Sequence, residues 1–253
     1  MLLFAAITLS CLSQNDATVM IMYMKVKPGE VDKYLKLEKE WKKIHQARME
    51  KGYITGWQLW QKMYAGTDDE YQYIVIDWYR DFLATAQTGT VEVIGDMYSD
   101  KASEELMKRT LDVRKLVKTD VMHRVVDADL VKPTSYLTVS QMKVKPGMEG
   151  KYLEMERDIF KPLHEEAIRS GQMSTWSVWA KWPFGEGDYQ YAAVNGFKDF
   201  ADLVNLDYPG LFKTVHPDIN VDQFMQKIPD VRKNTAVEVW RLVDSVLPGA
   251  EHE

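Results

Sequence analysis

The stretch Met24-Lys25-Val26-Lys27-Pro28-Gly29 occurs a second time, letter for letter, as residues 142–147. The match continues along the chain as far as Asp112-Val113-Arg114-Lys115, which returns as residues 230–233. A self-match that recurs at one fixed spacing is the signature of a duplicated structural unit. The sequence therefore predicts two copies of one fold within a single chain.

Each copy is predicted to fold in the order β-α-β-β-α-β. In the first copy, a stretch rich in β-branched residues ends at the Lys-Pro-Gly turn signal, and a stretch without Gly or Pro follows with apolar residues at helical spacing. The predicted elements of the first copy are strand 19–26, helix 30–51, strands 54–64 and 70–79, a short helix from 81, helix 100–117 and strand 119–127. Those of the second are strand 136–144, helix 148–170, strands 174–182 and 189–197, a short helix from 199, and strand 236–244.

The two copies differ by one residue inside their first long helix. The offset between equivalent residues is 118 at Glu38 and Glu156, and it becomes 119 at His45 and His164. Pro162 lies in this interval. Because proline lacks an N–H and clashes with the preceding turn, we expect the second-copy helix to be kinked or divided there.

The duplication sets the expected domain organisation. The first copy is assigned to residues 17–127, a linker to 128–135 and the second copy to 136–247. A four-stranded sheet with helices on one face leaves its other face bare. Two such sheets can cover their bare faces by closing a barrel together.

The turn after the first strand, the helix carrying Glu and His, and the Gly-x-x-x-x-Trp step into the second strand (Gly52 to Trp57, Gly171 to Trp176) resemble the dimeric α+β barrel superfamily. This superfamily includes antibiotic-biosynthesis-type monooxygenases and NIPSNAP-like proteins. The resemblance implies an α+β fold in which two ferredoxin-like βαββαβ repeats pack as an intrachain pseudo-dimeric barrel. It implies little about activity, because the superfamily hosts many unrelated chemistries.

The N-terminus differs in composition from the rest of the chain. Residues 1–10 (MLLFAAITLS) are apolar and uncharged, and polar residues begin after Cys11. A run of this length is too short to span a bilayer and suits a secretory signal peptide, which we assign to residues 1–13. It predicts an extracytoplasmic protein, either periplasmic or secreted. The alternatives are a buried first strand, or a lipoprotein that attaches to a membrane through lipidation of Cys11.

Composition narrows the classes of partner and cofactor. The net charge of −6 over 253 residues argues against a nucleic-acid-binding protein, and the sole cysteine, Cys11, excludes an intrachain disulfide. The five histidines show no metal-binding spacing, so no metal and no cofactor is expected, although some barrels of the superfamily hold haem through a histidine. A homo-oligomer is compatible with the sequence.

The first helix of each copy carries the sharpest candidate site. Glu38 and His45 share a helical face with apolar residues, and so do Glu156 and His164. A buried carboxylate needs a partner, and a His–carboxylate pair is a natural acid/base unit. We therefore take these four as candidate catalytic residues. The alternative is that they lock each helix onto its sheet.

The strands carry candidate ligand-binding residues. Arg124 and Arg241 lie in the closing strands between apolar neighbours, and each should need an anion or a carboxylate partner. That partner is a substrate carboxylate inside the barrel or, in a structural role, Glu38, Glu156 or Asp77. Aromatic residues of the middle strands suit a flat apolar ligand or simply fill the core: Trp57, Trp176, Tyr73 and Tyr191.

These patterns favour a protein that binds a small apolar or aromatic molecule. A second hypothesis is a cofactor-independent oxygenase or isomerase, in which His45 or His164 acts as a base and Arg124 or Arg241 holds an anion. A third is a structural module with a filled barrel. The volume inside the barrel separates the third hypothesis from the other two.

Overall fold

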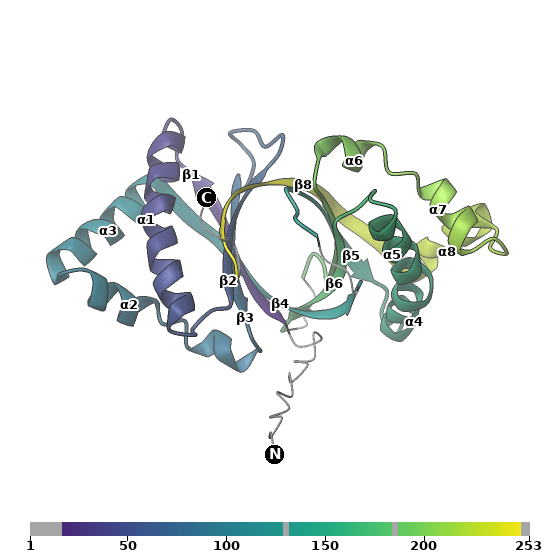
Figure 1. Ribbon diagram of the computed structural model, residues 1–253, viewed down its shortest axis with the longest axis horizontal. Coiled ribbons are helices and arrows are strands. Elements are labelled where there is room, and N and C mark those ends of the chain that lie inside the picture. Colours follow the sequence, from purple (N-terminus) through teal and green to yellow (C-terminus); the bar gives the residue numbers. More distant parts are fainter. Residues whose placement is uncertain (1–16, 129–131, 184–186, 249–253) are drawn as a thin grey trace, which may run out of the picture.

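The computed structural model of this protein describes residues 17–128, 132–183 and 187–248, so the predicted signal peptide and part of the predicted linker lie outside the described residues. Eight antiparallel strands close one barrel, in the order β1-β3-β2-β8-β5-β7-β6-β4. Figure 1 shows the barrel in the centre, with the helices of the first copy on one side and those of the second copy on the other.

The first copy consists of β1 (Thr18–Val26), α1 (Val31–Glu50), β2 (Gly56–Lys62), β3 (Tyr73–Tyr79), the 3-10 turn η2 (Leu83–Ala86), α2 (Thr90–Met97), α3 (Asp100–Val113) and β4 (Arg114–Asp127). The second consists of β5 (Tyr136–Val144), α4 (Glu149–Met155), the π-helical turn η3 (Glu156–Phe160), α5 (Lys161–Arg169), β6 (Thr175–Trp182), β7 (Tyr191–Phe197), α6 (Phe200–Val204), α7 (Tyr208–Val215), α8 (Val221–Val231) and β8 (Arg232–Val246).

The predicted pseudo-dimeric α+β barrel is confirmed. Each copy forms its own sheet, β4-β1-β3-β2 or β8-β5-β7-β6, and the two sheets join edge to edge where β2 pairs with β8 and β4 pairs with β6. The strand order repeats after four strands, so a half-turn about the barrel axis relates the copies. Equivalent residues of the two copies therefore lie at the same mouth of the barrel.

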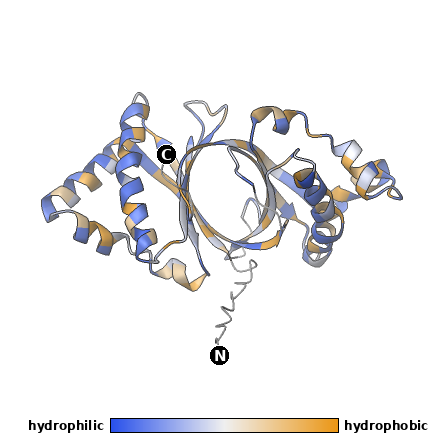
Figure 2. Ribbon diagram, viewed as in Figure 1, coloured by the Kyte–Doolittle hydropathy of each residue, from blue (hydrophilic) through white to orange (hydrophobic). Residues whose placement is uncertain are grey.

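Three apolar clusters hold the layers together. One fills the barrel interior with side chains from both copies, including Tyr23, Trp60, Trp179 and Trp240. The other two lie between the outer face of each sheet and its helices. Figure 2 shows hydrophobic and hydrophilic residues mixed along helices and strands, as expected where each element buries only one side.

The inserted residue of the second copy is absorbed by a π-helical turn. The helix predicted over 148–170 is divided into α4, η3 and α5, and Pro162 lies in the first turn of α5. Proline is tolerated there because its missing N–H would have no helical partner. A π turn holds one residue more than an α turn, so the equivalent residues before and after it keep their places on the sheet.

Three element ends predicted from the sequence are wrong: the end of the helix predicted over 100–117 and the starts of the strands predicted over 119–127 and 236–244. Helix α3 ends at Val113, not near residue 117, and the closing strands begin at Arg114 and Arg232. The reason is tertiary: these strand starts pair with the last residues of β1 and β5, beyond a β-bulge in each pair. Helices α2, α7 and α8 were not predicted.

Candidate functional site

The four candidate residues of the first helices are buried between helix and sheet, as their helical phase predicts. Glu38, His45, Glu156 and His164 are each at most 5% exposed. The two histidines occupy equivalent places: the ring of His45 stacks on Trp57 at 5.0 Å, and that of His164 on Trp176 at 4.8 Å.

In the first copy, His45 belongs to a buried charged network. Arg48 Nη1 lies 2.7 Å from His45 Nδ1 and 2.8 Å from Asp77 Oδ2, and its Nε donates to the carbonyl of Thr88. Guanidinium groups only donate, so Nδ1 of His45 accepts and its ring proton is on Nε2. Burial lowers the pKa of His45 well below its usual range, and Arg48 lowers it further. The histidine is therefore neutral.

In the second copy, uncharged groups replace this network. Ala167 and Asn195 stand where the first copy has Arg48 and Asp77. The hydroxyl of Tyr208, at the start of α7, lies 2.9 Å from His164 Nε2 and accepts a bond from Asn195. Burial lowers the pKa of His164 to about 3, so this histidine is neutral too.

The two glutamates face arginines other than those expected from the sequence. Glu38 Oε1 lies 3.4 Å from Nε of Arg114, and burial raises the pKa of Glu38 to about 7 against the opposing effect of this arginine. Burial likewise raises the pKa of Glu156 to about 7, with Arg232 opposing. Both arginines belong to the repeated Asp-Val-Arg-Lys motif, and that repetition is the signal that could have found them.

The two candidate strand arginines are not equivalent. Arg124 contacts the ring of Trp179 in the barrel interior and lies 3.4 Å from Asp127. Arg241 is exposed and donates to Gln61. At the repeat offset Arg241 corresponds to His123 and not to Arg124, and a shift of one residue moves a strand side chain to the opposite face. Neither arginine forms a bond to Glu38 or Glu156.

The candidate aromatic residues face the helices. Trp57 and Tyr73 belong to the apolar layer of the first copy, and Trp176 and Tyr191 to that of the second. Each tyrosine packs against a tyrosine of the first helix: Tyr34 lies 4.8 Å from Tyr73, and Tyr152 lies 4.8 Å from Tyr191. Their rings therefore fill the helix–sheet layers.

Neither helix histidine fits a haem ligand. Such a histidine presents a free ring nitrogen to a broad open slot, and here both rings are stacked on tryptophan, with Arg48 bonded to one and Tyr208 to the other.

The described residues also contain no group of three or more His, Cys, Asp or Glu side chains that could hold a metal ion. In the same part of the chain, no helix is both long and apolar enough to cross a membrane.

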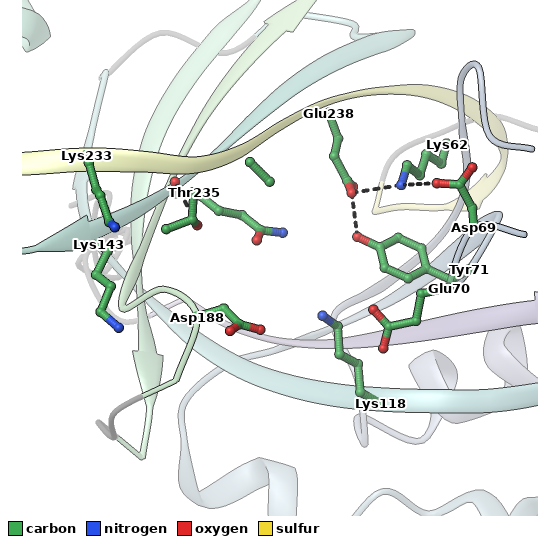
Figure 3. Close-up of a pocket in the computed structure, with 12 residues that line it drawn as sticks. Lys62, Asp69, Glu70, Tyr71, Lys118, Lys143, Asp188, Lys233, Thr235 and Glu238 are labelled. Carbon is green, nitrogen blue, oxygen red and sulfur yellow. Dashed lines mark hydrogen bonds and ion pairs between the residues drawn. The ribbon is translucent and has the colours of Figure 1, made fainter.

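An open cleft of about 470 Å³ lies at one mouth of the barrel (Figure 3). Its walls come from strand ends and loops of both copies: Lys62, Asp69, Glu70, Tyr71, Lys118, Gln141, Lys143, Asp188, Lys233, Thr235, Ala236 and Glu238. Sequence reasoning did not single out this cleft. It is assembled from residues that are far apart in the chain and that only barrel closure brings together.

One wall of the cleft is a fixed polar cluster. The Tyr71 hydroxyl donates to Glu238 at 2.7 Å, and the indole N–H of Trp240 donates to the other carboxylate oxygen at 2.8 Å. Lys62 bridges Glu238 and Asp69, at 3.2 and 3.0 Å. Burial, and then Glu238, raises the pKa of Tyr71 well above its usual range, so its phenol stays protonated. This wall is therefore held in place by its own hydrogen bonds, and its two carboxylates share one ammonium group.

The two-fold symmetry of the barrel places a second polar cluster, related to the Tyr71–Glu238–Lys62 cluster, at the same mouth. There the Tyr189 hydroxyl donates to Asp120 at 2.6 Å, Lys181 lies 2.5 Å from the same carboxylate, and the hydroxyl of Tyr23 lies 3.2 Å from that of Tyr189. The symmetry breaks at one strand pair. Tyr23 lies opposite Lys118 in the first copy, and the equivalent pair in the second copy is Gln141 opposite Ala236.

That replacement accounts for the position of the cleft. In the first copy, the ammonium of Lys118 lies over the ring of Tyr23, so the two side chains occupy the space between their strands. Gln141 and Ala236 are smaller, and both line the cleft. The cleft therefore lies on the side of the mouth where the second copy has lost an aromatic ring and a long side chain.

Comparison with known proteins agrees with the fold. No protein-family model matches the chain, and no curated protein matches it. Among solved structures, a putative monooxygenase from Fusobacterium nucleatum shares 11% identity over 94% of this chain and 97% of its own, with a TM-score of 0.62. A putative monooxygenase from Lactobacillus acidophilus shares 12% identity over 92% of this chain and 97% of its own, with a TM-score of 0.59. A putative chlorite dismutase shares 12% identity over 90% of this chain and 95% of its own, with a TM-score of 0.53. At this identity the likeness establishes the α+β barrel fold alone.

Proposed function

We propose that this protein is a small-molecule-binding α+β barrel and that its ligand binds in the cleft at the barrel mouth. The observation that carries the proposal is the cleft itself, about 470 Å³ of open space beside the fixed Tyr71–Glu238–Lys62 cluster. Ligand sites of proteins are concave, largely preformed and supplied with a few fixed polar groups, and this cleft has those properties.

The cleft suits a ligand better than the two places considered from the sequence. The barrel interior is occupied by a cluster of buried apolar side chains from both copies, so the interior itself fits the filled-barrel hypothesis and a ligand would have to bind at the mouth. Both helix–sheet layers are packed around aromatic rings. The proposed ligand is accordingly more polar than the apolar molecule that the aromatic content of the strands favoured.

An oxygenase is the alternative, because two solved structures with this fold are described as putative monooxygenases. Such an enzyme, in the form considered from the sequence, would use a helix histidine as base beside a strand arginine. In the first copy the basic nitrogen of His45 already accepts from Arg48, and Arg124 lies against the barrel interior. Binding in the mouth cleft therefore has better support than proton abstraction by His45.

We also propose that binding takes place outside the cytoplasm. The support is the apolar run at residues 1–10 followed by polar residues. Mass spectrometry of the protein exported by a bacterial host tests the idea: removal of about 13 residues is expected, and a diacylglyceryl adduct on Cys11 selects the lipoprotein form. An intact Met1 in the exported fraction contradicts it.

The binding function is tested by mapping where small fragments bind. Amide chemical shifts are recorded by NMR while a library of neutral, cationic and anionic aromatic fragments is added to the folded chain. We expect shifts clustered at Gln141, Thr235, Ala236 and Glu238. Shifts clustered around His45 or His164 would support the enzyme instead, and no clustered shifts would support a purely structural module.

Two substitutions on one strand supply the control. Ala236 lines the cleft, whereas Val237 is its exposed neighbour, pointing to the opposite face of β8. Ala236→Trp should abolish fragment binding by filling the cleft. Val237→Trp adds the same ring on the other face and should leave binding unchanged.

A further inference from the structure

Three of the four lysines that line the cleft, Lys118, Lys143 and Lys233, form no ion pair with the residues that the structure describes. Lys143 and Lys233 are register partners on β5 and β8, which brings two like charges side by side. Lys118 points into the cleft from β4, with its ammonium 4.8 Å from the ring centre of Tyr23 and 5.6 Å from that of Tyr71. Among the residues that the structure describes, none of these three lysines has an ion-pair partner, and Lys143 donates only to the carbonyl of Gly187.

Two of the four acidic groups of the cleft, Glu238 and Asp69, share one lysine. Glu238 accepts from Tyr71 and Trp240 and pairs with Lys62, and Asp69 also pairs with Lys62. Glu70 and Asp188 remain, both exposed at the rim and placed on either side of Lys118 in Figure 3. The lining as a whole holds four lysines and four carboxylates. Lys143 and Lys233 lie together at the end away from Glu238 and Asp69, so positive charge is concentrated at that end of the cleft.

Like charges directly opposite each other destabilise a pair of strands. An anion bound between Lys143 and Lys233 would relieve that repulsion and form charge-assisted hydrogen bonds with both ammonium groups. The side chains of Thr235 and Gln141 line the same cleft and supply further polar contacts. Lys118 would meet the same ligand from β4.

We propose that the ligand of the mouth cleft is a small anion, a molecule carrying a carboxylate or a phosphate group, held by Lys118, Lys143 and Lys233. This inference rests on the proposed binding function. It assigns the sign of the ligand's charge and the three residues that select it. Carboxylate and phosphate share the chemistry that these lysines recognise, and the probes below separate them.

The test uses four probes that share a benzene ring and differ in charge: benzoate, phenyl phosphate, neutral benzyl alcohol and cationic benzylamine. Each is titrated into the folded chain at pH 7.5 while the amide shifts of Gln141, Thr235 and Ala236 are followed. We expect saturable binding of benzoate or phenyl phosphate, weakening as salt is added because the charges are screened. The tighter of the two anions identifies the group.

Substitutions of the three lysines test whether they hold the anion. Lys143→Gln with Lys233→Gln should weaken binding of the anion by about tenfold for each charge-assisted bond lost, and Lys118→Gln by about tenfold. The matched control is Lys25→Gln with Lys115→Gln, the equivalent register pair of the first copy on the same rim, which does not line the cleft. The control should change binding less than twofold. Melting curves confirm that every variant is folded.

The possible results distinguish a failure of the anion assignment from a failure of the proposed ligand binding in the cleft. If benzyl alcohol or benzylamine shifts the cleft residues and binds as tightly as either anion, the charge assignment is overturned and the binding function stands. An equal loss of anion binding in the Lys25/Lys115 control would also overturn the assignment. If no probe shifts the cleft residues of the unsubstituted chain, both proposals fall.

Discussion

The two helix–sheet layers solve the same packing problem with different chemistry. Both stack a buried histidine on a tryptophan at about the same separation, 5.0 Å for His45 and 4.8 Å for His164. The first layer surrounds its histidine with Arg48, Asp77 and Tyr79, and the second has Ala167, Asn195 and Phe197 at the same positions. Only the second uses Tyr208, the first residue of α7; the equivalent helix of the first copy, α2, begins with Thr90 instead.

This difference teaches that the buried ion pair is not required by the fold. A buried pair gains little net stability over a neutral replacement, because removing both charges from water costs about as much as their attraction returns. The histidine persists in both layers because it fills the space against tryptophan and bonds to whichever polar group lies beside it. Its neutral state in both copies fits a packing role.

The largest effect should follow from breaking the charged network on one side only. Arg48→Ala leaves Asp77, which is 2% exposed, buried without its cation. We expect a loss of about 3–5 kcal/mol in the free energy of unfolding. Urea denaturation followed by far-UV circular dichroism measures it.

The matched control for Arg48→Ala gives the first copy the two uncharged residues that the second copy has at these positions. The double variant Arg48→Ala with Asp77→Asn removes both charges together, and it should recover a substantial part of the stability lost in the single variant. A double variant as unstable as Arg48→Ala alone would show that the ion pair is needed where it stands. The comparison drawn above would then be mistaken.

The next effect concerns the buried glutamates, which the two copies share. Folded Glu38 keeps its proton to about pH 7, whereas an exposed glutamate releases it near its ordinary value of 4.5. Between these values the folded state binds more protons, so the free energy of unfolding should fall as the pH rises from about 4.5 to 7. A shift of this size is worth about 3 kcal/mol, and Glu38→Gln should remove that part of the pH dependence.

Glu156→Gln should behave in the same way, because burial raises the pKa of Glu156 to about 7 as well. Denaturation of both variants at pH 5 and pH 8 isolates this contribution from that of His164, whose low pKa makes stability rise with pH below about 6.5. A pH profile unchanged by either substitution would mean that the glutamate is already ionised in the folded protein.

Replacing either buried histidine should cost less stability than Arg48→Ala, and the loss should be similar in the two layers. His164→Ala leaves the hydroxyl of Tyr208 without one partner and opens a cavity against Trp176. We expect a loss of about 1–3 kcal/mol, and a comparable loss for His45→Ala. Thermal melting measures both. A substitution that leaves melting unchanged but abolishes binding or turnover would instead assign that histidine to a functional site.

The fold was predictable because the duplication is a global signal. Two copies of Met-Lys-Val-Lys-Pro-Gly fix the turn after the first strand, and one extra residue near Pro162 predicts a divided helix. The strand starts at Arg114 and Arg232 were not predictable from local pattern, because they extend the strands through pairing with β1 and β5. Propensity is a weak guide where tertiary pairing decides.

The candidate sites were predictable only in part. Helical phase predicted the burial of Glu38 and His45, but not that Glu38 would face Arg114, which only the packing of helix on sheet brings near. Arg48 lies three residues from His45 on the same helix, so that contact could have been read from the sequence. The mouth cleft does have a signal in the sequence. Comparing the copies position by position finds Tyr23 and Lys118 replaced by Gln141 and Ala236.

The smallest change in stability should come from giving the second copy the residues that the first copy has at positions 141 and 236. This change should nevertheless abolish ligand binding in the cleft. Gln141→Tyr with Ala236→Lys copies the first-copy pair into the second, where the same strands pair in the same register. Gln141 is buried, but the new lysine can lie over the new ring as Lys118 lies over Tyr23, so the free energy of unfolding should change by no more than about 1 kcal/mol. The two larger side chains should fill the cleft and abolish fragment binding, measured by NMR titration as above. Binding that survives in a folded double variant would show that the cleft does not owe its existence to the divergence of the two copies.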